Sequence, residues 1–300
     1  MLFGRKGFRN ITLTRPILKN FKKSFQITKI KFKLSLPFSY SVMSNEEIPI
    51  KLNSLVEKKE LYEFKPFIDW YDCLLAESRY NDQEIQIRSI SIQQVDRFKG
   101  NKIGFVKLLV DSFSIKEKAT IPGIVILRGG SVSILFIIES DDPSNKEGPY
   151  LILTCQPRLA VPSFNLLELP AGMLDGSGEF QGKAAQELYE ETGLKINKDE
   201  LINLMQGKRD SLSRDQCSPE NGVLTSPGFT DERLHLFHCR KKLPSHKIQE
   251  LQGKLTGERE SGELISLKLI PLEDIYTATS DIKVLASMAL YSKFFLRSTI

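Results

Sequence analysis

Acidic residues are absent from the first 45 positions of the chain, which hold ten of its 42 Lys and Arg residues. The remainder carries the other 32 basic residues against 37 acidic ones, a net charge of −5. The overall charge of +5 therefore comes from the leader alone and does not predict nucleic acid as a partner. The leader also lacks an apolar run long enough for a secretory signal or a membrane span.

A basic, acid-free leader interleaved with Phe, Ile and Ser is typical of an organellar transit peptide. We predict such a peptide over residues 1–44, with cleavage near Val42 to Ser44. The alternatives for this segment are a disordered basic tail and an arm that binds a membrane surface or a nucleic acid.

Cysteine and histidine are scarce, which disfavours several kinds of site. No pair of cysteines has the C-x2-C spacing of a zinc site, and their wide separation disfavours a disulfide framework and fits a reducing compartment. No Ser-His-Asp arrangement and no P-loop is evident. His235 and His238 fall on a predicted strand, where we expect structural roles. The four cysteines are Cys73, Cys155, Cys217 and Cys239.

Residue periodicity predicts an α+β protein, with a mixed sheet between helices after a small β-rich N-terminal region. We assign residues 45–121 to that region and residues 122–300 to the main domain. The predicted helices span 67–80, 180–193 and 280–297, and Gly193 is expected to close the second. The predicted strands span 86–93, 102–115, two segments within 122–140, 149–158, 165–172, 232–240 and 263–275.

Three glutamates gather in the second helix, within the stretch QELYEETGL at 186–194. The period of 3.6 residues places Glu187, Glu190 and Glu191 within an arc of about 100°. Each like-charged neighbour pair destabilises a helix by roughly 0.2–0.5 kcal/mol. The simplest interpretation is a solvated charged face. A divalent cation would instead turn the repulsion into attraction, and Mg²⁺ prefers few carboxylates together with waters and phosphate oxygens.

The surrounding sequence resembles the Nudix box, G-x5-E-x7-R-E-U-x-E-E-x-G-U, in which U is apolar. Gly172 opens the match, and Glu187, Leu188, Glu190, Glu191, Gly193 and Leu194 follow at the spacing of the box. The stretches ELPAG (168–172), SPGFTDER (226–233) and GELISLKLIPLED (262–274) are similar to segments of ADP-ribose and ADP-sugar diphosphatases, above all the plant-type chloroplast ones. The resemblance covers roughly residues 65–297. It implies the Nudix fold, in which a loop–helix–loop holds divalent metal, Mg²⁺ or Mn²⁺, against a diphosphate.

The activity implied is hydrolysis of an ADP-sugar, ADP-glucose or ADP-ribose, to AMP and a sugar 1-phosphate. The implied metal ligands are Glu187, Glu190, Glu191 and the backbone carbonyl of Ala171, with Glu187 and Glu190 also counted as catalytic. Glu263 is the candidate general base, in competition with Glu258 and Glu260. The candidate substrate-binding residues are Arg128, Arg158, Phe229, Glu232 and Arg233.

Three positions depart from the family pattern. Gly178 stands at the first Glu position of the box and Gln186 at its Arg position. In the family these two residues often form an ion pair beside the metal carboxylates; Gln186 can donate a hydrogen bond but supplies no charge. Glu179 is a candidate replacement for the lost acid. Phe229 replaces a loop glycine, and it either restricts the approach of the backbone or stacks on a base.

Two rival functions keep the box. One is a Nudix hydrolase for another nucleoside diphosphate derivative, and the other is a degenerate Nudix module that binds a nucleotide without cleaving it. The resemblance also implies a homodimer and a plastid location, with the mitochondrion as the alternative because basic leaders serve both organelles. The expected partner is a nucleotide sugar, without nucleic acid.

Overall fold

The computed structural model describes residues 48–80, 84–145, 148–174, 179–205, 222–257 and 264–296, all within one compact unit. The predicted transit peptide at 1–44 lies outside the described residues, as does Cys217.

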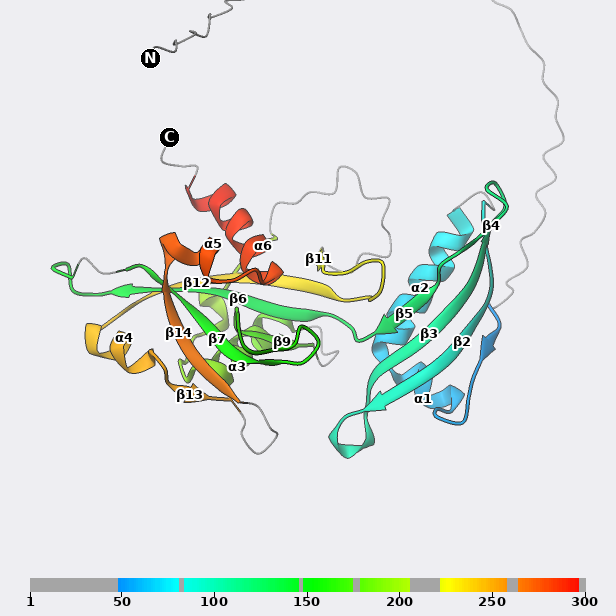
Figure 1. Ribbon diagram of the computed structural model, residues 1–300, viewed down its shortest axis with the longest axis horizontal. Coiled ribbons are helices and arrows are strands. Elements are labelled where there is room, and N and C mark those ends of the chain that lie inside the picture. The colour runs from blue at the N-terminus through cyan, green and yellow to red at the C-terminus, as the bar shows by residue number, and fades with distance from the viewer. Residues whose placement is uncertain are drawn as a thin grey trace, which may run out of the picture. The chain divides into compact units, whose positions relative to one another are not determined.

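The chain first forms a five-stranded sheet that packs against two helices (Figure 1). The strand order is β1-β2-β3-β4, and β5 also pairs with β3. Alternate residues of β3, which are Val106, Leu108 and Val110, are buried against apolar side chains of the helices. The elements are β1 (Ile50–Lys51), α1 (Lys58–Glu63), α2 (Lys65–Tyr80), β2 (Ile85–Arg97), β3 (Ile103–Ser114), β4 (Ala119–Ile121) and β5 (Ile124–Leu127).

A second sheet of nine strands follows, in the order β10-β12-β6-β7-β14-β13. β12 runs parallel to β6, whereas β7 is antiparallel to both β6 and β14, so the sheet is mixed. β8, β9 and β11 extend it by pairing with β7, β6 and β12. The strands are β6 (Ser131–Ser140), β7 (Tyr150–Arg158), β8 (Ser163–Glu168), β9 (Ala171–Met173), β10 (Ile202–Asn203), β11 (Val223–Leu224), β12 (Arg233–Leu243), β13 (Leu255–Thr256) and β14 (Ile265–Pro271).

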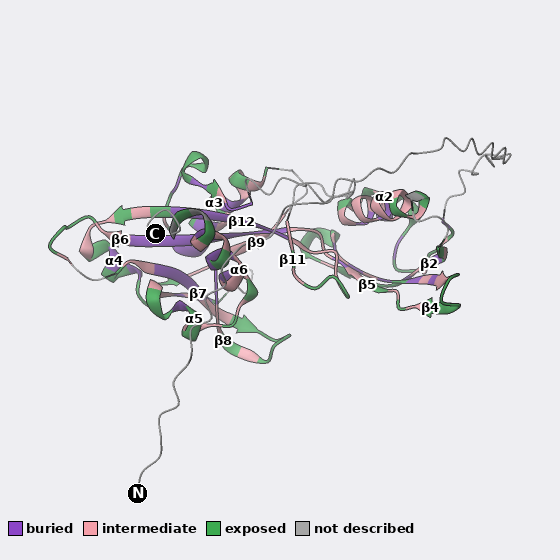
Figure 2. Cartoon of the chain, turned by 90° about the horizontal axis from the view of Figure 1, so that it is seen from above, coloured by how far each residue is buried: buried purple, intermediate pink, exposed green. Residues whose placement is uncertain are grey.

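Helices cover both faces of the second sheet, because β6 is apolar on both sides (Figure 2). Its Ile134 and Phe136 pack with α3 (Phe180–Thr192) and α4 (Ser245–Leu251). Its Leu135 and Ile137 pack on the opposite face with α5 (Ile275–Ala278) and α6 (Ile282–Tyr291). The predicted mixed sheet between helical layers is thus confirmed.

The predicted helices occur as α2, α3 and α6, and Gly193 ends α3 in the left-handed conformation at φ 73°. The short helices α1, α4 and α5 were not predicted. The strand predicted at 165–172 is two strands, β8 and β9, because Pro170 between them cannot donate to a ladder. The predicted domain boundary at residue 121 precedes β5, whereas the chain passes from one sheet to the other between β5 and β6.

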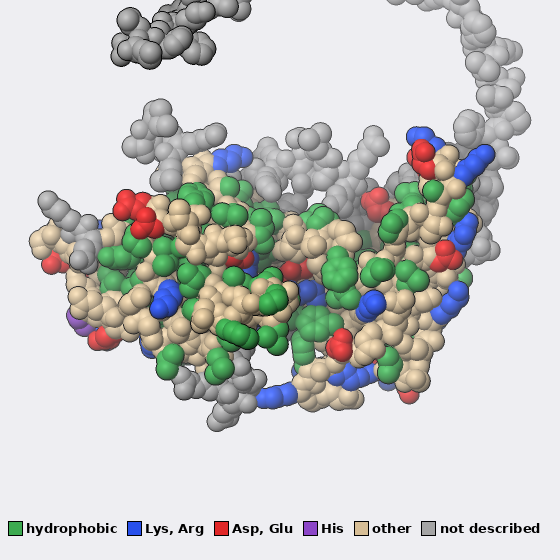
Figure 3. Space-filling view, viewed as in Figure 1, with side chains coloured by type: hydrophobic (Ala, Val, Ile, Leu, Met, Phe, Trp, Pro, Cys, Tyr) green, Lys and Arg blue, Asp and Glu red, His purple; other side chains and the backbone are tan. Residues whose placement is uncertain are grey.

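On the face shown in Figure 3, Lys and Arg side chains are interspersed with Asp and Glu side chains rather than gathered into one basic patch. Among the described residues, no helix is both long and apolar enough to cross a membrane.

Candidate active site

The acidic helix α3 packs its apolar side against the second sheet. Ala184 and Leu188 are fully buried there. The three box glutamates lie in different environments: Glu191 is buried, Glu187 is largely buried and Glu190 is exposed. They are therefore not splayed together into solvent, and two of them face the protein.

Glu191 contacts the short strand β9. The Ala171 backbone N–H donates to Glu191 Oε2 at 3.1 Å. Ala171 sits opposite Ser133 of β6, while the adjacent backbone bonds run from Ile134 N to Pro170 O and from Leu174 N to Gly130 O. Hydrogen-bonded and non-hydrogen-bonded pairs alternate along an antiparallel ladder, so Ala171 and Ser133 form a non-hydrogen-bonded pair. The N–H and C=O of Ala171 therefore both point away from β6. The Ala171 carbonyl is therefore directed to the same side as the Glu191 carboxylate.

Glu187 lies against the next residue of β9, Gly172. A Cβ atom at Gly172 would fall 1.9 Å from Glu187 Cδ and 2.1 Å from its Oε1. Only glycine leaves room for the carboxyl group at this position. Glu187 Oε1 also pairs with Lys183 Nζ at 2.8 Å. Glu187 and Glu191 thus meet successive residues of one strand.

Glu190 is directed elsewhere. Its Oε1 accepts a hydrogen bond of 2.7 Å from Gln186 Nε2, on the exposed side of α3. Within the described ranges, no group of three or more Asp, Glu, His or Cys side chains is arranged to hold a metal ion. Two carboxylates and the Ala171 carbonyl are nevertheless a suitable oxygen set for Mg²⁺, which is usually bound by one or two carboxylates plus substrate phosphates.

Several predicted residues fall outside the described ranges: Glu258, Glu260 and Glu263, and the box position Gly178. Glu179, the candidate replacement for the missing box acid, is the N-cap residue of α3 and makes no side-chain capping bond.

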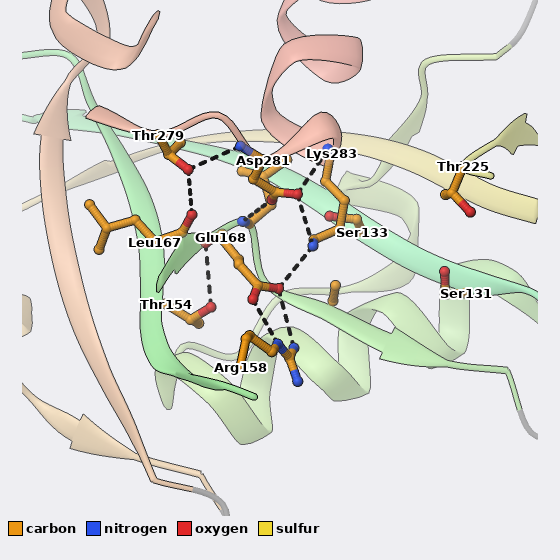
Figure 4. A network of polar contacts seen from close by, with 12 residues as sticks. Ser131, Ser133, Thr154, Arg158, Leu167, Glu168, Thr225, Thr279, Asp281 and Lys283 are labelled. Carbon is orange, nitrogen blue, oxygen red and sulfur yellow. Dashed lines mark hydrogen bonds and ion pairs between the residues drawn. The ribbon is translucent and has the colours of Figure 1, made fainter. Parts of the chain in front are cut away.

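A network of charges binds the residues of the ELPAG segment that precede β9 (Figure 4). The Glu168 carboxylate, 3% exposed, accepts from Arg158 Nε at 2.7 Å and Nη2 at 3.2 Å, and from Lys283 Nζ at 2.9 Å. Lys283 Nζ also contacts Asp281 Oδ1 at 3.0 Å, and Leu169 N donates to Asp281 Oδ2 at 3.3 Å. The start of α6 is thereby bonded to the residues that lead into Ala171.

The electrostatics of Glu168 reflect this pairing. Burial raises the pKa of the Glu168 carboxyl, but the Arg158 hydrogen bond and the Lys283 charge outweigh burial and hold that pKa below its ordinary value. The Arg158 pKa is raised, first by its hydrogen bond to Glu168, with smaller contributions from the charges of Glu191 and Asp281. Arg158 therefore lies within the electrostatic reach of Glu191.

Replacing Lys283 by Met is expected to lower the free energy of unfolding by about 2 kcal/mol, less than the 3–5 kcal/mol typical of a broken buried pair because Arg158 still pairs with Glu168. The wild-type carboxylate stabilises the fold above its ordinary pKa of 4.5, and this contribution is lost as the pH falls through the lower folded-state pKa. In Lys283→Met that pKa rises, so the loss begins at a higher pH. Urea unfolding between pH 4 and 8 checks both effects.

The matched control is Lys59→Met, which removes an exposed pair with Glu63. It should leave the unfolding free energy within about 0.5 kcal/mol of wild type. Equal losses in the two variants, or an unchanged pH dependence in Lys283→Met, would contradict the proposed strength of the network.

The predicted substrate loop is held by two acids. Glu232 forms an ion pair with Arg128 Nη1 at 3.1 Å, and it accepts hydrogen bonds from Ser131 Oγ at 2.8 Å and Thr225 Oγ1 at 2.9 Å. The neighbouring Asp231 accepts the backbone N–H of Arg128 at 2.8 Å and of Gly129 at 3.0 Å. Glu232 is thus an internal support for Arg128 rather than a free group at the surface.

A cleft of about 1300 Å³ lies beside this loop. Arg128, Phe229 and Arg233 line it, as do Trp70 of α2 and His235 of β12. Phe229 is 52% exposed, so its ring is available for stacking. Burial, with a smaller contribution from the Arg233 charge, lowers the His235 pKa to about 4, so this imidazole is neutral at physiological pH.

The structure brings Ala171, Glu187 and Glu191 together, and it places Arg128, Phe229 and Arg233 on one cleft. Sequence reasoning missed Glu168, Lys183, Asp231, Asp281 and Lys283. Glu168 stood within the quoted ELPAG segment, but its partner Lys283 and the neighbouring Asp281 come from a distant element with no sequence signal.

Comparison with known proteins gives the family. No family model matches the chain. Nudix hydrolase 14, chloroplastic, from Arabidopsis thaliana is 38% identical to it over 229 residues, which cover 75% of this chain and 69% of that protein. The chain belongs to the Nudix hydrolase family, as the box predicted. A crystal structure of an ADP compounds hydrolase aligns with a TM-score of 0.48 at 15% identity, covering 72% of this chain and 97% of that one, which is too distant to bear on function.

Proposed function

We propose that this Nudix hydrolase is a divalent-metal-dependent ADP-sugar diphosphatase that releases AMP and a sugar phosphate from ADP-glucose or ADP-ribose. The observation that carries the proposal is the convergence of Glu187 and Glu191 on Ala171 and Gly172. A solvated charged face would not press two carboxylates against one strand.

In this mechanism Glu187, Glu191 and the Ala171 carbonyl would hold Mg²⁺ or Mn²⁺, and Glu190 would join them by turning away from Gln186. The bound ion supplies neutralisation of phosphate charge and lowers the pKa of a coordinated water. Glu263 is the proposed general base, which would take a proton from the attacking water.

Arg128 and Arg158 are the proposed phosphate-binding side chains. Arg128 Nε is buried and has no hydrogen-bond partner within the described residues, a deficit that an anionic oxygen would remove. Arg158 donates from Nε and Nη2 to the Glu168 carboxylate, and the proposed phosphate contact uses its remaining nitrogen, Nη1. Phe229, in the cleft, is the proposed surface on which the base stacks.

We also propose a plastid location, supported by the name of the Arabidopsis relative and the composition of residues 1–44. A fluorescent fusion of residues 1–44 found outside plastids would argue against it.

A homodimer is proposed on the exposed apolar side chains of the β7–β8 hairpin, Leu159, Val161 and Phe164. Sedimentation of the purified protein as a monomer would exclude the dimer.

The test of function is a substrate panel of ADP-glucose, ADP-ribose and UDP-glucose, with products separated by chromatography. We expect AMP and a sugar phosphate from an ADP-sugar, no product in EDTA, and recovery when Mg²⁺ is returned. Cleavage of UDP-glucose alone would favour the second hydrolase reading. Nucleotide binding without any product would favour the degenerate module.

A further inference from the structure

We infer that Lys183 is a positioning residue for the active-site carboxylates, and that it supplies the positive charge that position 186 of the box lacks. The inference rests on the proposed function, because it assigns Lys183 a role toward the metal site. It explains how the chain tolerates Gln186 where the family pattern has Arg.

Gln186 itself does not take over the role of that Arg. Its amide is on the exposed side of α3 and donates to Glu190 at 2.7 Å. It therefore contacts the one box glutamate that is turned outward, and as a neutral group it contributes no charge to the other two.

Lys183 occupies the place where a cation is needed. Its Nζ lies 2.8 Å from Glu187 Oε1, and the two side chains are only 17% and 14% exposed. The same Glu187 carboxyl is pressed against Gly172. Lys183 on one side and β9 on the other thus fix the carboxyl in a single place, next to Ala171 and Glu191.

The energetics of the helix do not account for Lys183. It is the fourth residue of α3, near the positive end of the helix dipole, where cations are disfavoured. The order Lys followed by Glu at i,i+4 is also less stabilising than the reverse order. Helix stability would favour a lysine near the C-terminal end of α3. We therefore attribute the presence of Lys183 to its contact with Glu187.

The experiment is a charge-relocation series: Lys183→Gln, Lys183→Arg, and the double variant Lys183→Gln/Gln186→Arg. Two readouts are taken, the affinity for Mn²⁺ without substrate, from the free-ion EPR signal, and kcat/KM. We expect Lys183→Gln to lose about tenfold in both, in the range seen for residues that orient metal ligands. Lys183→Arg should stay near wild type, and the double variant should regain most of the loss.

Lys247→Gln, which removes an exposed pair with Glu250 on α4, is the matched control and should change neither readout. Circular dichroism separates loss of folding from loss of site geometry. Tighter Mn²⁺ binding in Lys183→Gln would overturn the inference, because Lys183 would then only compete with the metal. So would an unrescued double variant. Wild type that neither binds Mn²⁺ nor cleaves a nucleotide sugar would overturn the proposed function as well.

Discussion

Glu190→Gln is expected to lower kcat by about 10²–10³-fold, since a metal site contributes several kcal/mol and each 1.4 kcal/mol is tenfold in rate. Glu190 is exposed, and Gln at this position can still accept the hydrogen bond from Gln186 through its amide oxygen. The free energy of unfolding should therefore change by no more than about 0.5 kcal/mol. The measurements are steady-state kinetics with an ADP-sugar and Mg²⁺, and urea unfolding.

The control for Glu190→Gln is Glu250→Gln, which removes another exposed acid, on α4, that pairs with Lys247. It should keep wild-type kinetics. Full activity in Glu190→Gln would show that Glu190 does not bind the metal. The proposed carboxylate ligands would then be Glu187 and Glu191 only.

Gly172→Ala has the second largest expected effect. The added methyl group would lie 1.9 Å from Glu187 Cδ, so the Glu187 carboxyl or β9 must move. A displacement of this order costs about 10²-fold in rate when it disturbs the geometry of a catalytic group. Overpacking also destabilises by about 1–3 kcal/mol. Both effects are measured on the same purified variant, by kinetics and by thermal unfolding.

Gly182→Ala, in the helix α3 that carries Glu187, is the matched control. The nearest atom to its added methyl group is the end of the flexible Glu179 side chain, at 3.0 Å. Alanine is favoured over glycine inside a helix by about 0.5–1 kcal/mol, so this variant should be active and slightly more stable. If Gly172→Ala were as active as Gly182→Ala, the close contact between Gly172 and Glu187 would not be required for activity.

The sequence predicted those parts of the site that lie within one continuous pattern. The spacing of the glutamates on α3, the glycine that ends the helix and the opening Gly172 are local features, and in the structure α3 ends at Gly193 and Gly172 lies against Glu187. The two layers of helices followed from periodicity alone, because β6 and α3 have strong apolar patterns.

The sequence did not predict contacts that join distant segments. Asp281 is 112 residues from Leu169, and Lys283 is 115 residues from Glu168, so no periodicity relates them. Lys183 was missed for a different reason: it lies inside the box, at a position where the family pattern prescribes no residue. Short helices such as α4 escaped because seven residues carry too little periodic signal.

The attachment of α6 to the ELPAG segment has a practical consequence for anyone shortening this protein. Thr279 Oγ1 donates to the Leu167 carbonyl at 2.6 Å, and Asp281 and Lys283 bind the next two residues. A fragment that ended before residue 279 would retain every residue of the Nudix box yet lose the anchors of the strand that faces it. The start of α6 is thus a structural support of β9, and we expect deletions from the carboxyl end to displace the strand that Glu187 and Glu191 contact.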